Sequence, residues 1–292
     1  MATITPIQSL LDPMALVRDA WDYRFLIPSQ VSRLNDISLE SAKVTLGRLT
    51  QAGYLAAIPR PVISTSEPDI VYALDQRGAD EIALRLGVDR EAVRWRKYHN
   101  QVGRQYMDHR LAVNDVRIAL TVGAQSQGGG MRRWLYEPVI KEWTVDDPDE
   151  LAPPLRFRPD AYVHLVPDGS SPRSIHAFVE VDMGTESHAR FASKIRRYLS
   201  YKDSRLFRIR FNSRAFRVLV IATSLTRLRA LKKATEDQGG RRSFWFALLD
   251  RLVSGGLGAR SWQIAGTDGA DGPVGNELFP KRGRSDASVS PR

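Results

Sequence analysis

Three helical segments and two extended segments follow one another in the first 90 residues of the chain. The first helical segment begins after Asp12 and Pro13, a suitable helix cap and first-turn pair. The third runs from Ser38, a second helix cap, to Gly53, a residue type that readily takes the left-handed conformation of a helix end. Two strand-like stretches, YLAAI and IVYALD, come next with a Pro-containing loop between them, and a closing helix follows. This order limits the first part of the chain to a small helical domain with a two-stranded ribbon.

Such an order of elements is typical of a winged helix-turn-helix domain, which we assign to residues 1–90. The third helix of this domain type enters a DNA groove. Here that helix has Leu39 on its apolar side and presents Lys43, Thr45 and Arg48 on its polar side. The domain as a whole is slightly acidic, so a solvated helix face in a docking or dimerisation module is the alternative interpretation.

From residue 91 onward the chain alternates helical and extended segments. A long leading helix, or two helices, is expected over residues 90–125. Strands are expected in WLYEPVIKEWTV, RFRPDAYVHLV, IHAFVEVDMG, FRVLVIATS and SFWFALLDRLV, with helices before and after the fourth of them. This pattern predicts a mixed α+β or α/β domain with crossovers over residues 91–265, followed by a Gly- and Ser-rich disordered tail over residues 266–292.

The composition excludes several classes of function. The chain has no cysteine, which excludes a disulfide framework, Cys-rich zinc sites, iron–sulfur ligation and a thiol nucleophile. It has no GxxxxGK[ST] loop for ATP and no His-hydrophobe-His triplet of the two-histidine tyrosine relaxases. Its apolar stretches are too short to span a bilayer, and the first residues do not have the form of a signal peptide. We therefore expect a cytoplasmic protein with no membrane partner.

The net charge of +10 is concentrated in one segment. Residues 190–233 hold 14 basic and one acidic side chain, whereas residues 111–189 hold seven basic and 12 acidic ones. The basic segment is too rich in apolar and aromatic residues to be disordered. Its charge therefore indicates that it binds a polyanion, which we expect to be DNA. The side chains expected on DNA phosphates are Arg190, Arg196, Arg197, Lys202, Arg208 and Arg210.

Carboxylates gather directly before the basic segment. In a hairpin, Asp160 at the start of one strand can lie beside Glu180 at the end of the next, and Asp182 shares the face of Glu180 because side chains alternate along a strand. Mg²⁺ or Mn²⁺ suits such a site, because Mg²⁺ needs few carboxylates and completes its shell with water and substrate phosphate oxygens. Lys194, on the helix that follows, is the candidate for a point charge on the scissile phosphate. We therefore expect metal ligation by Asp160, Glu180 and Asp182.

This arrangement resembles the PD-(D/E)xK nuclease fold and, more closely, the replication-relaxation family of plasmids and mobile elements, in which a winged helix precedes such a domain. The resemblance is carried by Pro159-Asp160, Glu180-Val181-Asp182, Gly184-Thr185-Glu186, Lys194, Tyr198 and the stretch from His109 to Asp115. That family includes C-type mobilisation relaxases, which nick an origin of transfer with a metal ion and carboxylates. The resemblance implies that Asp160 and Glu180 are metal ligands, Lys194 the electrostatic catalyst and Asp115 an accessory acid.

Two functions stay open at this point. The nuclease pattern has a lysine two residues after the acid, whereas this chain has Asp182 at that position. Either the lysine has moved to the next helix, or the chain is an inactive descendant of the nucleases. Asp182 is equally well explained as a turn or helix-cap acid. The leading hypothesis is a metal-dependent relaxase or nicking endonuclease of plasmid or mobile-element replication or transfer. The alternative is a non-catalytic DNA-binding replication or transcription regulator. Relaxosome or replication proteins, or a second copy of the chain, are compatible partners for both.

Overall fold

The computed structural model describes residues 12–60, 70–136, 158–166, 174–204, 206–255 and 261–267. The chain divides into two compact units, residues 1–114 and residues 115–292. Each unit is considered separately below. The tail predicted for residues 266–292 lies outside the described residues apart from its first two positions.

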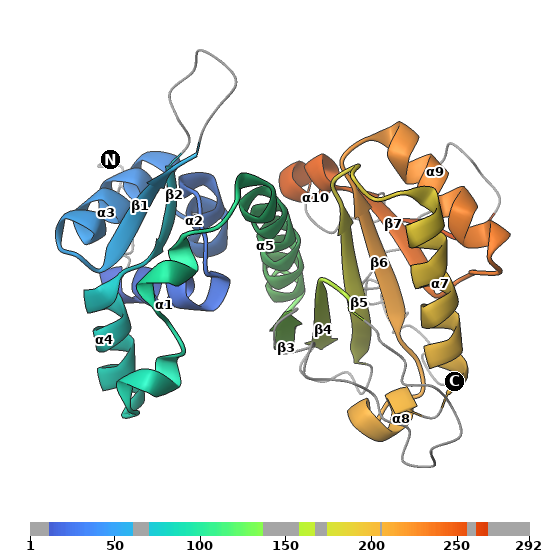
Figure 1. Cartoon of the computed structure of the whole chain (residues 1–292), viewed down its shortest axis with the longest axis horizontal. Coiled ribbons are helices and arrows are strands. Elements are labelled where there is room, and N and C mark those ends of the chain that lie inside the picture. Colours follow the sequence, from blue (N-terminus) through green and yellow to red (C-terminus); the bar gives the residue numbers. More distant parts are fainter. Residues whose placement is uncertain are drawn as a thin grey trace, which may run out of the picture. The chain divides into compact units, whose positions relative to one another are not determined.

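Unit 1 opens with the winged helix-turn-helix arrangement that the sequence predicts. Its elements are α1 (Pro13–Tyr23), α2 (Pro28–Asn35), α3 (Leu39–Gln51), β1 (Leu55–Pro59), β2 (Ile70–Leu74) and α4 (Gln76–Leu86), and β1 pairs antiparallel with β2 (Figure 1). The predicted caps are present: Asp12 accepts a hydrogen bond from the Met14 amide, and Ser38 from the Ser41 amide. Leu39, expected on the apolar side of α3, is 45% exposed because it is the first residue of the helix and precedes the buried face.

The second part of unit 1 contains two short 3₁₀ turns and half of a long helix. These are η1 (Arg90–Val93), η2 (Lys97–Asn100) and α5 (Arg104–Gln125). The first half of α5 completes the core of unit 1, where Met107 and Leu111 pack with Phe25 of the segment after α1. The Asn114 amide also donates hydrogen bonds to the carbonyls of Tyr23 (3.1 Å) and Phe25 (2.6 Å). The unit boundary therefore falls after residue 114, 24 residues later than the position expected from the sequence.

Unit 2 is built on a mixed sheet, as the sequence predicts, and its described residues form six strands where five were expected. Its strands are β3 (Gly130–Tyr136), β4 (Ala161–Val166), β5 (Ile175–Asp182), β6 (Arg217–Ala222), β7 (Phe244–Leu248) and β8 (Gln263–Ile264), and they lie side by side in chain order. The pairs β3–β4, β4–β5 and β7–β8 are antiparallel, whereas β5–β6 and β6–β7 are parallel. The stretch SFWFALLDRLV differs from its predicted single strand, because β7 ends at Leu248 and α10 (Leu249–Gly255) begins directly after it.

Helices cover one face of this sheet. They are α7 (His188–Asp203) and α9 (Leu225–Asp237), which contact each other, and a short α8 (Leu206–Phe211) follows α7 (Figure 1). The core formed by the sheet and these helices is rich in aromatic side chains, including Tyr162, Phe178, Phe191, Tyr198, Phe216, Phe244 and Phe246. All eight residues of β5 are buried, so the strand that carries the candidate acids lies at the centre of the unit. Among the described residues, no helix combines the length and the apolar character needed to cross a bilayer.

Candidate active site

Asp160 is fixed against the end of β5. Its backbone amide donates to the carbonyl of Val179 (3.1 Å), and its Oδ2 accepts a hydrogen bond from the amide of Val181 (2.7 Å). Glu180 lies between these two residues. The strand register thus brings Asp160 and Glu180 together, as a hairpin would.

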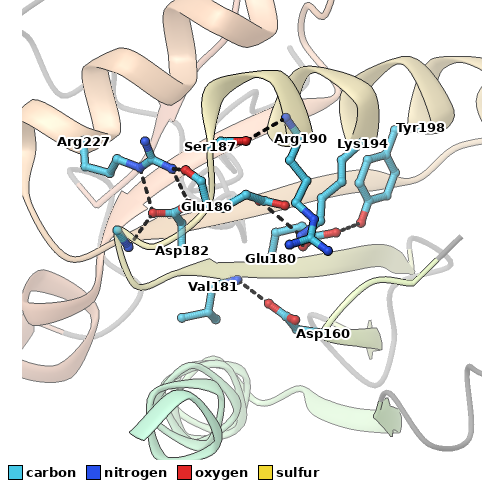
Figure 2. A network of polar contacts seen from close by, with 11 residues as sticks. Asp160, Glu180, Val181, Asp182, Glu186, Ser187, Arg190, Lys194, Tyr198 and Arg227 are labelled. Atoms are coloured by element: carbon cyan, nitrogen blue, oxygen red, sulfur yellow. Dashed lines mark hydrogen bonds and ion pairs between the residues drawn. The ribbon is translucent and has the colours of Figure 1, made fainter. Parts of the chain in front are cut away.

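Two side chains of α7 hold the Glu180 carboxylate. The Tyr198 hydroxyl donates to Oε1 at 2.6 Å, and the Lys194 ammonium donates to Oε2 at 2.9 Å (Figure 2). Residues 194 and 198 are one helical turn apart, so both face the same strand. The Glu180 side chain is only 6% exposed, whereas the Lys194 side chain as a whole is 31% exposed.

Several carboxylates lie around Lys194. Its ammonium also lies 3.3 Å from Glu186 Oε2, so the carboxylates of Glu180, Glu186 and Asp160 act on one cation. Burial raises the pKa of Glu180 to about 7; Lys194 opposes this shift, and Asp160 adds to it. Burial alone would lower the pKa of Lys194, but the three carboxylates outweigh it and raise that pKa, so the ammonium stays protonated.

Asp182 has a different environment from its neighbour. Both of its carboxylate oxygens accept hydrogen bonds from Arg227 of α9, each at 2.8 Å, and Oδ1 also accepts one from the Gly184 amide (Figure 2). Arg227 further donates to the carbonyl of Glu186 at 2.6 Å. The structure thus places Asp182 in a bidentate ion pair that closes the turn between β5 and α7, which matches the turn-acid interpretation of the sequence.

Asp115, the expected accessory acid, lies in the middle of α5 and is half-buried. Asp115 is the first residue of unit 2, the unit that also contains the other candidate acids. Its role in the site stays a prediction.

The carboxylates present suit a hard divalent ion that needs few protein ligands. In the part of the chain that the structure describes, no group of three or more His, Cys, Asp or Glu side chains is arranged to hold a metal. Asp160 lies against the backbone on either side of Glu180, and two carboxylates are enough for Mg²⁺ where water and phosphate complete the shell. Asp182 is held by the arginine of α9, Arg227, whereas Glu180 is held by a lysine and a tyrosine of α7, so Asp160 and Glu180 are the acids that remain candidates for an ion.

The basic residues expected on DNA are distributed over both units. In unit 1, Lys43 and Arg48 are exposed on α3, while Thr45 is half-buried and donates to the carbonyl of Ser41 (2.8 Å). In unit 2 the exposed ones are Arg190, Arg196, Arg197 and Lys202 on α7, and Arg208 and Arg210 on α8. Arg196 is turned toward α9, where its Nη1 donates to Gln238 Oε1 at 2.7 Å. The expected set therefore comes from α3 of unit 1 and from α7 and α8 of unit 2.

Two groups of residues were missed by the sequence-based site. Arg227 lies 45 residues after Asp182, and no local pattern indicates that pairing. His164 and His176 face each other across β4 and β5 with ring centroids 4.3 Å apart, and the Tyr162 hydroxyl shares a 2.6 Å hydrogen bond with His176 Nδ1. Along the sequence, neither histidine has a partner at a spacing typical of metal ligands. The two are brought together only by the register of β4 and β5.

Comparison with known families and structures gives one match. A family model described as replication-relaxation matches residues 20–212, more than half of the chain, including α3, the candidate acids and all of α7. No curated protein and no solved structure matches the chain at a significant level.

Proposed function

The chain belongs to the replication-relaxation family, and we propose that it is a metal-dependent relaxase or nicking endonuclease of plasmid or mobile-element replication or transfer. The family associates the chain with replication and the processing of DNA. The finer assignment, to strand cleavage with Mg²⁺ or Mn²⁺, rests on the chemistry of the residues in unit 2.

One observation carries the proposal: Lys194 reaches back from α7 to Glu180 at 2.9 Å, and Asp160 is held next to Glu180 by the β5 backbone. The sequence lacks the usual lysine two residues after the acid, and the ammonium from the next helix takes a position beside the carboxylate pair. Two acids and one lysine on adjacent elements make a set suited to phosphodiester cleavage.

Each residue has a definable role in such a reaction. Asp160 and Glu180 would hold the ion, which supplies an activated water and neutralises charge on the phosphate. Tyr198 fixes the Glu180 side chain through its hydroxyl, so the ligand oxygen stays oriented. Lys194, kept protonated by the surrounding carboxylates, can donate to a non-bridging phosphate oxygen as negative charge develops there.

The test combines nicking of supercoiled plasmid with a direct measurement of metal binding. We expect Mg²⁺-dependent conversion to the open circular form, and a loss of at least about 100-fold in rate for Asp160→Asn and for Glu180→Gln. Titration calorimetry with Mn²⁺ is expected to lose its signal in the same variants. Asp237→Asn is a matched control, because this carboxylate is exposed on α9 and forms a surface ion pair with Lys233. Nicking that survives both substitutions would rule out the proposal.

The second candidate is a DNA-binding regulator without catalysis. It is favoured by the ion pair that occupies Asp182 and by the hydrogen bonds that engage both oxygens of Glu180. DNA binding that is unaffected by EDTA, together with no heat of Mn²⁺ binding and no nicking, would establish this function in place of the first.

A further inference from the structure

A basic pocket lies at the far end of α7 from the candidate acids. It has a volume of about 250 Å³ and is formed by the end of α7, by α8 and by the segment before β6. Its lining residues are Lys202, Ser204, Phe207, Arg208, Arg214 and Phe216.

Among the described residues, the lining of the pocket contains three cations and no acid. Lys202, Arg208 and Arg214 are exposed, and none of them makes an ion pair with another described residue. The neighbouring Asp203 is exposed and is not part of the lining. Three unneutralised positive charges around one hollow favour an anion, and guanidinium groups are particularly suited to phosphate because of their planar pairs of donors.

The floor of the pocket is apolar. Phe207 and Phe216 are 3% and 6% exposed, and their ring centroids lie 4.7 Å apart. Ile209 of α8 is 69% exposed beside Arg208. The Ser204 hydroxyl donates to the carbonyl of Tyr201 (2.7 Å), so its proton is already engaged. A cationic rim over an apolar floor fits a phosphate attached to a sugar and a base better than it fits a bare inorganic ion.

The pocket and the candidate acids are connected by one helix. Lys202 follows Lys194 by eight residues on α7, which corresponds to about 12 Å along the helix axis. A single DNA strand with one phosphate at Lys194 therefore has another phosphate, a few nucleotides away, within reach of the pocket.

We infer that this pocket binds a backbone phosphate of the DNA strand that is processed at Asp160, Glu180 and Lys194, and so holds the strand at a fixed offset from the reacting phosphate. The inference rests on the proposed function for its substrate. A free mononucleotide or inorganic phosphate has the same phosphate chemistry, so the experiment includes both.

The experiment measures binding of a fluorescein-labelled single-stranded oligodeoxynucleotide to the full chain by anisotropy in EDTA, where no cleavage occurs. The test variant is Arg208→Ala with Arg214→Ala. The control is Arg242→Ala with Arg251→Ala, which removes the same charge from exposed positions of unit 2 outside the pocket.

We expect the affinity of the test variant for the oligonucleotide to fall by about tenfold or more. The slope of log K against log salt is expected to become shallower by about 0.7 for each phosphate that the variant no longer neutralises. The control is expected to stay within about twofold of the natural chain, and matching thermal unfolding of both variants verifies folding.

Position is tested with oligonucleotides that carry one neutral methylphosphonate linkage. We expect the neutral linkage to weaken binding at one position of the oligonucleotide in the natural chain, and to have no effect at that position in the Arg208→Ala, Arg214→Ala variant. An equal effect in both proteins overturns the inference. Displacement of the oligonucleotide by micromolar deoxynucleoside monophosphate or inorganic phosphate also overturns it, in favour of a small-ligand pocket.

These outcomes are separable from those of the nicking assay. If nicking is observed and the test variant binds DNA normally, the pocket inference fails and the proposed activity stands. If nicking is never observed and the test variant loses affinity, the pocket is a DNA-binding element of the non-catalytic alternative.

Discussion

Asp182 and Arg227 form a buried ion pair in unit 2 that has no direct part in the proposed chemistry. The two side chains are 3% and 15% exposed and make two 2.8 Å hydrogen bonds. Removal of the arginine leaves a buried carboxylate with its charge uncompensated, so Arg227→Ala is expected to lower the free energy of unfolding by about 3–5 kcal/mol. Urea denaturation measures this loss.

Lys233→Ala is the matched control for that substitution. It breaks an ion pair on the same helix, Lys233–Asp237, whose side chains are 76% and 55% exposed, and is expected to cost less than about 1 kcal/mol. Equal losses in the two variants would show that Arg227 is a surface charge and not part of a buried turn.

The stacked histidines predict a pH dependence of stability. Burial lowers the pKa of His176 from 6.5 to about 4, and His164 adds to the shift. Below about pH 6.5 the unfolded chain protonates His176, whereas the folded chain does so only near pH 4. The stability that the neutral His176 provides is therefore complete above pH 6.5 and is lost as the pH falls from 6.5 to about 4.

Urea denaturation across that range compares the natural chain with His176→Asn. We expect the stability advantage of the natural chain to shrink as the pH is lowered. A constant difference between the two proteins over this pH range would contradict the neutral, buried state of the His176 imidazole.

Residues of the site differed in how far the sequence could predict them. Glu180 and Lys194 lie on consecutive elements, a strand and the helix after it, so periodicity alone places them near each other. The pairs Asp182–Arg227 and His164–His176 depend on how elements align across the sheet. Strand register is set by the whole core and leaves no local pattern in the sequence.

At the scale of elements, the packing of α4 against the ribbon is sensitive to a single atom. A Cβ at Gly78 would clash with the Tyr54 carbonyl oxygen, so Gly78→Ala forces backbone to move and is expected to destabilise the chain by about 1–3 kcal/mol. Gly47, inside α3, has nothing within 4 Å of such an atom, and Gly47→Ala is expected to stabilise the chain by about 0.5–1 kcal/mol. Opposite signs in thermal unfolding would support this packing, and a gain for both would contradict it.

Helices with a capping residue were the elements that the sequence predicted best. Ser38 and Gly53 delimit α3 through local hydrogen bonds and a left-handed backbone, which act within a few residues. The end of β7 was missed because FWFALLDRL is apolar over most of its length, and a short apolar run fits a strand or a buried helix equally well.

At the scale of the whole molecule, the position of the positive charge predicts which unit dominates DNA affinity. Residues 190–233 carry the surplus, whereas the winged helix is slightly acidic. Arg190→Ala with Arg197→Ala is therefore expected to weaken duplex binding by about tenfold, with a salt slope smaller by about 0.9 for each phosphate no longer neutralised. Lys43→Ala with Arg48→Ala removes the same charge from α3 and is expected to have the smaller effect in the same anisotropy assay. The reverse order would place the main DNA-binding surface on the winged helix.

The division of α5 between the two units has a practical consequence for dissecting the protein. A fragment cut at residue 90 would lack Met107, Leu111 and Asn114, and so would lose part of a core and the donors that satisfy the carbonyls of Tyr23 and Phe25. The shortest fragment that preserves those interactions ends at residue 114, halfway along a helix. Proteolysis or truncation at the apparent end of the winged helix would therefore yield an incomplete fold. If such a fragment failed to bind DNA, the result would not show that the recognition helix has no part in binding.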